Sequence, residues 1–243
     1  PCKKCAACNA GNYNLCENYD YIGSRRDGAF AEYVSCPAEN LIEIPDGVSF
    51  EEAAVTEPAA VALHAVKAAK LHPGDNVIVT GLGPVGLLAA QWAKIAGARI
   101  TGIDRNEEKL RLGKRLGVAA ITPAEAAGIK EAADTVFECS GSDYYQEQSI
   151  IMARKRGAIV YVGNAEKDLV IRKDMFSKLL RKEITIRGSW NSVHGSAFSE
   201  WTEVLNAMRR NLDVTSLISH RPKLEEITKV FDDMHNKRYV YVK

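Results

Sequence analysis

A glycine-rich turn in the middle of the chain has the residue spacing of a dinucleotide-binding site. Gly81, Gly83 and Gly86 form a G-x-G-x-x-G motif that directly follows Asn76–Thr80, a run with alternate β-branched residues. The first glycine permits a tight turn, the second lets a pyrophosphate approach the backbone, and the third lets the next helix pack close to the strand. The N-terminus of that helix offers free N–H groups and a partial positive charge to a phosphate. An ordinary strand–turn–helix would also carry flexible glycines, but here the whole expected context is present, so we predict a dinucleotide site.

A carboxylate follows the second strand of this unit. Arg99–Ile103 is a short predicted strand, and Asp104 stands directly after it, eighteen positions beyond Gly86. In dinucleotide-binding folds an acidic residue at this place binds the ribose hydroxyls of adenosine. Its charge would repel a 2′-phosphate, so the sequence favours NAD over NADP. Arg105 is a counter-signal, because an arginine near this position accommodates the 2′-phosphate of NADP.

Four of the six cysteines lie within the first sixteen residues, in the spacing C-x2-C-x2-C-x7-C: Cys2, Cys5, Cys8 and Cys16. Four thiolates in a polar loop predict a tetrahedral structural zinc site, which leaves no open coordination position for a substrate. Disulfides fit less well, because they need an oxidising compartment and the rest of the chain has the character of a cytosolic protein. A bacterial iron–sulfur motif has a shorter last spacing followed by proline, and no proline follows Cys16 here.

A further candidate metal ligand, Glu57, stands in the run Thr56-Glu57-Pro58. Proline is favoured in the first turn of a helix, so we predict that a helix begins here. Glu57 is either a metal ligand or a carboxylate that the helix dipole favours at this end. His64 lies two helical turns further on and is interpreted as a packed core histidine. Cys139 follows a predicted strand and is interpreted as a small residue near the cofactor, not as a nucleophile.

Two adjacent arginines, Arg25 and Arg26, precede a turn that Asp27-Gly28 predicts. Guanidinium groups bind phosphate in a bidentate manner, so this pair is a candidate clamp for a phosphorylated substrate. A solvated surface pair, or an anchor for loop carbonyls, is the other interpretation. The sequence alone leaves both open.

The bulk composition bears on the classes of function. The 243 residues include 32 basic and 31 acidic side chains, a formal charge of +1. No overall field therefore favours nucleic acid or an anionic membrane. The longest apolar run, residues 84–90, falls well short of the roughly 20 residues that span a bilayer. The chain begins inside the cysteine motif, and residues 238–243 look like a strand stopped in mid-course, so we expect sequence to be missing at both ends.

Strands and helices alternate through most of the chain. With the two strands above, four more segments make six predicted strands: residues 119–122, 135–138, 158–163 and 183–187. Helices are predicted at residues 107–117, 123–133, 143–154, 197–211 and 223–237. This alternation predicts an α/β fold with a doubly wound parallel Rossmann sheet. Upstream, residues 29–36 and 41–44 are predicted as short barrel-type strands, and Ser49 with Glu52 as a capping box.

These motifs together resemble the zinc-dependent medium-chain dehydrogenases, over essentially the whole chain. The pattern is similar to the polyol dehydrogenase branch of that family. Residues 19–33 and 180–190 look like the galactitol-1-phosphate 5-dehydrogenases, with the sorbitol (L-iditol) and threonine dehydrogenases as close relatives. The resemblance implies a cytoplasmic homodimer or homotetramer that acts on a small polyol or polyol phosphate. It also implies that residues 1–58 and 212–243 are the remnant of a GroES-like catalytic domain, and that residues 59–211 form the Rossmann domain.

The resemblance assigns roles to particular residues. The four cysteines match the family's structural zinc ligands, and Glu57 matches the last ligand of its catalytic zinc. The residues that match its cofactor segments are Gly81, Gly83, Pro84, Val85, Gly86, Asp104, Arg105, Val162, Gly163 and Ser189. In such an enzyme zinc acts as a Lewis acid on the substrate hydroxyl, and the adjacent carbon delivers hydride to NAD. Given this match, Arg25 and Arg26 are candidates either for loop structure or for the anchor of the substrate phosphate.

The sequence departs from the family pattern at the catalytic metal. The family's other catalytic zinc ligands are a cysteine and a Gly-His-Glu run, both upstream of the zinc loop. No Gly-His-Glu occurs in the chain, and its five histidines fit no such motif. A catalytic zinc needs about three protein ligands, so we expect the 243 residues alone to be inactive. A non-catalytic NAD-binding module and a sorbitol dehydrogenase are the alternatives.

Overall fold

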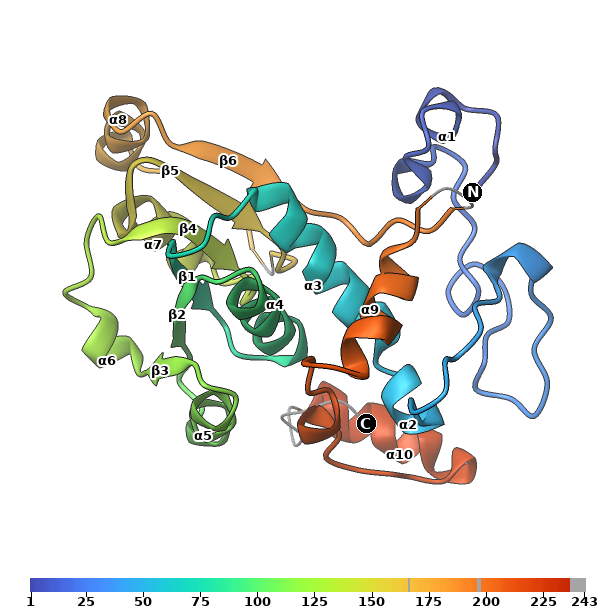
Figure 1. Ribbon diagram of the computed structural model, residues 1–243. Coiled ribbons are helices and arrows are strands. Elements are labelled where there is room, and N and C mark those ends of the chain that lie inside the picture. The colour runs from blue at the N-terminus through green and yellow to red at the C-terminus, as the bar shows by residue number, and fades with distance from the viewer. Residues whose placement is uncertain (166, 196–197, 237–243) are drawn as a thin grey trace.

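A parallel six-stranded sheet forms the centre of the protein (Figure 1). The computed structural model describes residues 1–165, 167–195 and 198–236. The strand order is β3-β2-β1-β4-β5-β6, and every neighbouring pair is parallel. The strands are β1 Asn76–Thr80, β2 Arg99–Ile103, β3 Ala119–Ile121, β4 Ala133–Glu138, β5 Ala153–Tyr161 and β6 Thr185–Gly188. This is the predicted doubly wound sheet, and its order reverses between β1 and β4, where such folds bind ligands.

Helices cover both faces of the sheet. They are α1 Ala6–Asn9, α2 Phe50–Ala53, α3 Thr56–Ala69, α4 Pro84–Ile95, α5 Glu107–Arg115, α6 Pro123–Ala126, α7 Asp143–Met152, α8 Lys173–Arg181, α9 Glu200–Met208 and α10 Ile227–His235. Short 3-10 turns lie at Tyr13–Leu15, Ala38–Asn40, Thr215–Leu217 and Leu224–Glu226. The capping box of α2 and the helix that begins at Thr56 are confirmed.

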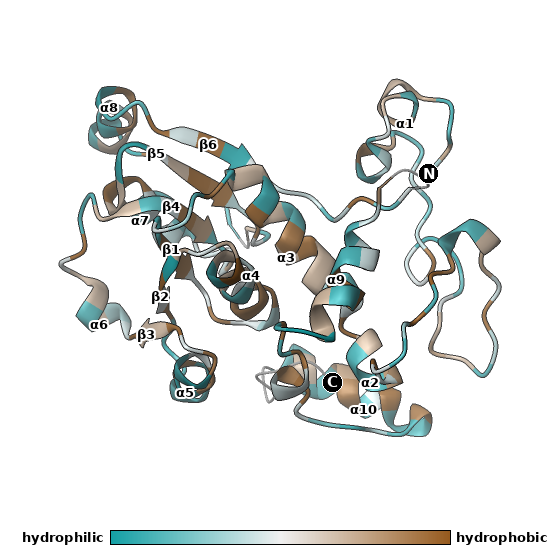
Figure 2. Ribbon diagram, in the orientation of Figure 1, coloured by the Kyte–Doolittle hydropathy of each residue, from teal (hydrophilic) through white to brown (hydrophobic). Residues whose placement is uncertain are grey.

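Alternate residues along each strand face opposite cores. On β1, Val77 and Val79 pack into the core formed with α3 and α4, whereas Ile78 faces the core formed with α7. The same alternation separates Val136 from Phe137 on β4. Strands with both faces buried are continuously apolar, as expected for a parallel sheet between two helical layers. Figure 2 shows this apolar character along the strands and along α3.

Helix α3 connects the sheet to the rest of the molecule. Four of its alanines, Ala59, Ala60, Ala62 and Ala65, are completely buried, and side chains this small allow close approach of α4 and α9. Trp92 on α4 donates its indole N–H to the carbonyl of Ala59 over 3.0 Å. In Figure 1, α3 runs from the sheet towards α9 and α2.

Two predicted strands are wrong. Residues 29–36 and 41–44 form bends and extended coil, without a strand in the described part of this region. A strand needs a hydrogen-bonded neighbour, and the described residues supply none for either segment. Their apolar side chains are correspondingly open to solvent: Phe30 is 68%, Tyr33 91% and Leu41 68% exposed.

Other differences are smaller. Helix α6 has one turn where residues 123–133 were predicted as a helix, because Ala127 and Gly128 form a turn and Ala133 already begins β4. Helix α8 was not predicted, and it contributes mainly Met175 to the core. The predicted start of α9 at Ala197 and the predicted C-terminal strand lie outside the described residues. No helix among the described residues has the length and apolar character needed to cross a membrane.

Candidate dinucleotide and metal sites

A cavity of about 450 Å³ opens at the carboxyl ends of β1, β2 and β4. It lies where the strand order reverses, so the topology itself creates the crevice. Its lining residues are Gly81, Gly83, Ile103, Asp104, Arg105, Lys109, Pro123, Cys139, Ser140, Gly141, Ser142, Asp143, Tyr145 and Lys167. Three cations and two carboxylates are among them, which leaves a net positive wall that suits a polyanionic ligand.

The three glycines have the predicted geometry. Gly81 has a φ of +85°, and a Cβ there would lie 2.8 Å from the backbone of Ser140. A Cβ on Gly86 would lie 1.9 Å from the carbonyl oxygen of Gly81, so the helix passes very close to the strand end. Around Gly83 a Cβ would meet no atom of the described residues within 4 Å. The open space beside Gly83, at the N-terminus of α4, therefore fits the approach of a pyrophosphate.

Asp104 is already held in place by the protein. Its Oδ2 accepts from the N–H of Leu82 over 2.8 Å, and its Oδ1 from the N–H of Asn106 over 2.9 Å. Asp104 is buried yet borders the cavity, whereas Arg105 is exposed at the same border. The fixed carboxylate is thus preorganised at the place where an adenosine ribose is expected.

Lys109 is a cavity residue that sequence reasoning missed. Its Nζ lies 3.6 Å from Asp104 Oδ2, and its side chain is mostly buried. It belongs to the first turn of α5, which Asn106 caps by accepting from two backbone N–H groups. Helix α5 follows β2 directly, so its first turn lies close to Asp104 at the end of β2. A basic residue in that first turn is the sequence feature that could have identified Lys109 as a cavity residue.

Glu138 is a second missed residue. It ends β4, is completely buried, and accepts from Thr80 Oγ1 over 3.3 Å and from Ser140 N over 2.8 Å. Its carboxylate therefore orders the loop that forms one wall of the cavity. Burial, and secondarily the charge of Glu138, raise the pKa of the Cys139 thiol far above its ordinary value, which agrees with the interpretation of Cys139 as a non-nucleophile. The same two causes raise the pKa of Tyr161 to about 12.

Several predicted cofactor residues lie outside the cavity lining. Pro84 and Val85 start α4 behind the turn. The N–H groups of Val162 and Gly163 both donate to the carbonyl of Glu138 over 2.9 Å, and Ser189 N donates to Tyr161 O over 2.9 Å. Ser189 Oγ is buried and has no hydrogen-bond partner within the described residues. Val162 and Gly163 directly follow β5, and Ser189 directly follows β6, so these three residues lie at strand ends outside the cavity lining.

The four predicted zinc ligands come together at the N-terminus. The sulfur atoms of Cys2, Cys5, Cys8 and Cys16 all lie within 4.8 Å of one another, and none of them forms a disulfide. Tetrahedral zinc with bonds of about 2.3 Å separates its sulfur ligands by about 3.8 Å, so the residues present fit zinc. It is the one cluster of three or more such ligands in the described residues.

The pKa values of the Cys2 and Cys8 thiols are shifted in opposite directions. Backbone hydrogen bonds from Lys4 and Cys5 lower the pKa of the Cys2 thiol to about 6. Burial raises the pKa of the Cys8 thiol to about 11. The N–H of Cys2 also donates to Cys16 Sγ over 3.1 Å. Backbone donors directed at sulfur stabilise thiolates, which are the form that binds zinc.

Glu57 stands apart from every other described group that could complete a metal site. It begins α3, and desolvation of its carboxyl raises its pKa although the residue as a whole is exposed. Its charge in turn contributes to raising the pKa of Tyr21, after burial as the larger cause. Among the described residues no second and third ligand join it. The residues present therefore do not fit a catalytic zinc.

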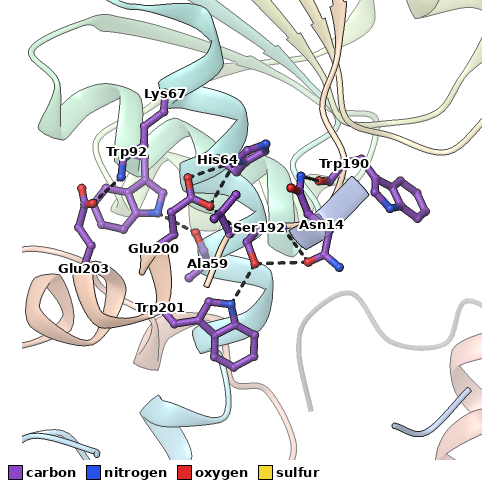
Figure 3. Close-up of polar contacts among 12 residues, drawn as sticks. Asn14, Ala59, His64, Lys67, Trp92, Trp190, Ser192, Glu200, Trp201 and Glu203 are labelled. Atoms are coloured by element: carbon purple, nitrogen blue, oxygen red, sulfur yellow. Dashed lines mark hydrogen bonds and ion pairs between the residues drawn. The ribbon is translucent and has the colours of Figure 1, made fainter. Parts of the chain in front are cut away.

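His64 was interpreted as a packed core histidine; its side chain is partly exposed and contacts a buried carboxylate. Its Nδ1 lies 3.1 Å from Glu200 Oε1, and Glu200 is only 2% exposed (Figure 3).

The contacts of the two adjacent arginines, Arg25 and Arg26, differ from each other. Arg26 forms an ion pair with Asp20 in the same loop, whereas Arg25 is exposed and its backbone N–H donates to Tyr21 O over 2.9 Å.

Comparison with known proteins places this arrangement in a family. Residues 84–210 match the zinc-binding dehydrogenase family, and residues 2–46 match the alcohol dehydrogenase GroES-like domain. The chain belongs to the zinc-binding dehydrogenases. The GroES-like match confirms the predicted second domain type, although the strands predicted for it are not formed among the described residues.

Three relatives show how far the similarity extends. A sorbitol dehydrogenase of Halalkalibacterium halodurans is 34% identical over 95% of this chain and 69% of its own length. The galactitol-1-phosphate dehydrogenase structure from Escherichia coli is 33% identical with a TM-score of 0.88, covering 98% of this chain and 72% of that one. A zinc-binding dehydrogenase from Sinorhizobium meliloti 1021 bound to NADP is 30% identical with a TM-score of 0.86, covering 94% of this chain and 69% of that one. The predicted cofactor classes, zinc and a nicotinamide dinucleotide, are confirmed at the level of the family.

Proposed function

We propose that this protein is a zinc-dependent, NAD-linked dehydrogenase of polyols or polyol phosphates. The observation that carries the proposal is the presence, in one chain, of a four-cysteine cluster and a complete dinucleotide cavity. We also propose the division into residues 59–211 for cofactor binding and residues 1–58 with 212–243 for the catalytic domain, in a cytoplasmic homodimer or homotetramer.

The residues of the cavity have separable tasks. Bound dinucleotide supplies the hydride acceptor. The N–H groups at the start of α4 bind its pyrophosphate beside Gly83. The fixed carboxylate of Asp104 binds the ribose hydroxyls, with Lys109 at its side. Val162, Gly163 and Ser189 are proposed to line the path of the nicotinamide, at strand ends beyond the cavity.

NAD is the proposed cofactor, and Asp104 the residue that selects it. Replacing it (Asp104→Asn) removes the charge that repels a 2′-phosphate and keeps one of the two oxygens that accept from the N–H groups of Leu82 and Asn106. We expect the ratio of the Kd for NADPH to that for NADH to fall at least about tenfold, the equivalent of about 1.4 kcal/mol. Fluorescence titration with both cofactors measures this ratio. Arg105→Ala serves as the opposite control and is expected to raise it; an unchanged ratio in Asp104→Asn contradicts the assignment.

The polypeptide of residues 1–243 is expected to bind cofactor without catalysing turnover. It supplies four ligands for one structural zinc and one carboxylate, Glu57, for a catalytic metal, which needs about three ligands. Metal analysis should give one zinc per chain, NADH fluorescence should show saturable binding, and no polyol should be oxidised. Turnover of any polyol, or a second tightly bound zinc, would refute this.

A non-catalytic NAD-binding module is the second candidate. The match of Glu57 to a catalytic-ligand position argues against it. A form of the protein with further residues decides between them: two zincs per chain with polyol oxidation support the enzyme, and one zinc without oxidation supports the module.

The phosphate on the substrate is proposed from the arginine loop. Arg26 is committed to Asp20, so Arg25 is the better candidate for contact with a substrate phosphate and Arg26 for loop structure. Assay of galactitol 1-phosphate and of sorbitol with an active form separates a phosphate-specific enzyme from a sorbitol dehydrogenase.

A further inference from the structure

The segment of residues 190–194, here called the connecting segment, lies between the cysteine loop and the Rossmann sheet. Asn14, which stands between Cys8 and Cys16, donates its side-chain amide to the carbonyl of Trp190 over 2.9 Å (Figure 3). Asn191 donates to the hydroxyl of Tyr19 over 2.6 Å. One edge of the connecting segment is thus bound to the first part of the chain.

The other edge of the connecting segment is bound to α9. Trp201 donates its indole N–H to Ser192 Oγ over 2.9 Å, and Val193 donates its N–H to Glu200 Oε2 over 2.7 Å. Glu200 in turn contacts His64 on α3. Figure 3 shows Ser192 between Asn14 and Trp201, with the His64–Glu200 contact beside them. The segment therefore has fixed anchors on the sheet side that do not involve the cysteine loop.

A continuous series of contacts leads from the connecting segment to the cavity. Ser189, directly before it, donates to the carbonyl of Tyr161 at the end of β5. The next residues of that strand end include Gly163, where a Cβ would lie 2.4 Å from the N–H nitrogen of Gly141. Gly141 lines the cavity, and its N–H donates to Glu138 Oε1 over 3.1 Å. Backbone hydrogen bonds and the close approach of Gly163 to Gly141 thus join the connecting segment to a wall of the cavity.

Asn14 lies within the cysteine loop, between two of the candidate zinc ligands. Within residues 1–16 only Cys8, Asn14 and Cys16 are buried, so the loop has almost no apolar core of its own. Loops of this kind derive their folded state from metal binding. We therefore expect the contact of the Asn14 amide with Trp190 to be lost when zinc is removed.

We propose that the connecting segment couples the zinc site to the dinucleotide site, with Asn14 as the positioning residue. The inference rests on the proposed function, because it requires both ligands to bind. When zinc is bound, the strand ends next to the cavity are ordered before the dinucleotide arrives. When zinc is absent, the dinucleotide must order them itself and binds more weakly. By linkage, dinucleotide raises the affinity for zinc by the same factor.

The test is a thermodynamic cycle with NADH and zinc on residues 1–243. Zinc-loaded protein, and protein stripped by chelation under reducing conditions, are titrated with NADH by fluorescence. We expect stripping to raise the Kd for NADH at least about fivefold, the lower end of typical coupling. Asn14→Ala with zinc bound is expected to show the Kd of the stripped protein and to lose its dependence on zinc. Asn12→Ala, an exposed asparagine in the same loop, is the matched control and should keep the full dependence.

Each outcome is decisive. Equal Kd values for loaded and stripped wild-type protein overturn the coupling. Full zinc dependence in Asn14→Ala overturns the role of Asn14. If Asn14→Ala does not fold, the reciprocal wild-type measurement, zinc affinity with and without NADH, decides the coupling by itself. Absence of NADH binding to zinc-loaded wild-type protein would instead refute the proposed cofactor function.

Discussion

Gly83→Ala is expected to leave the fold intact and to weaken NADH binding at least about tenfold, the equivalent of about 1.4 kcal/mol. Gly83 has a φ of −68°, which any residue adopts, and a Cβ there would meet no atom of the described part of the chain within 4 Å. The methyl group would instead occupy the space through which the pyrophosphate approaches the backbone. The Kd for NADH and the thermal unfolding temperature of the same preparation measure the two effects.

Gly86→Ala is the contrasting variant. Its Cβ would lie 1.9 Å from the carbonyl oxygen of Gly81, so α4 or the turn must move even without ligand. Overpacking of this kind costs about 1–3 kcal/mol or more, and each kcal/mol lowers Tm by roughly 2–4 °C in a chain of this size. A Gly83→Ala variant that loses stability but retains NADH affinity would show that the open space beside Gly83 is not the pyrophosphate site.

Cys8→Ser is expected to abolish zinc binding and to unfold the N-terminal loop while the sheet persists. Cys8 is the most buried of the four ligands, and structural zinc contributes about 10–16 kcal/mol of apparent binding free energy to small sites. The loop contains Lys3 and Lys4, so trypsin should cut there much faster in the variant, as mass spectrometry can follow. Metal analysis should fall from one zinc per chain to none.

Cys36→Ser is the matched control for this substitution. Cys36 lies outside the cluster, so its replacement should leave both zinc content and tryptic resistance unchanged. Retention of a full equivalent of zinc by Cys8→Ser would mean that residues other than the four-cysteine cluster hold the metal.

The cofactor unit was predictable from sequence because its requirements are local. The turn of Gly81, Gly83 and Gly86, the strands on either side of it and the position of Asp104 all lie within about thirty consecutive residues, the length of one strand–helix–strand unit. The cysteine cluster was predictable for the same reason. Backbone conformation and ligand spacing over short distances are properties that residue types specify directly.

The predictions that failed concern features that depend on contacts with residues distant in the sequence. Residues 29–36 have the alternating pattern of a strand, but a strand exists only where another strand accepts its hydrogen bonds, and none does among the described residues. Lys109 and Glu138 escaped notice because a lysine on a helix and a glutamate at a strand end are usually solvated. Only the folded arrangement places one beside Asp104 and encloses the other completely.

The sequence by itself determined the sheet, the glycine turn, the carboxylate that follows it and the four thiol ligands. The tertiary structure alone decided which arginine is committed to the loop, that Glu57 stands without partner ligands among the described residues, and that Asn14 contacts Trp190 across 176 positions of the chain. Contacts between distant residues depend on how whole elements pack, and no local spacing encodes them.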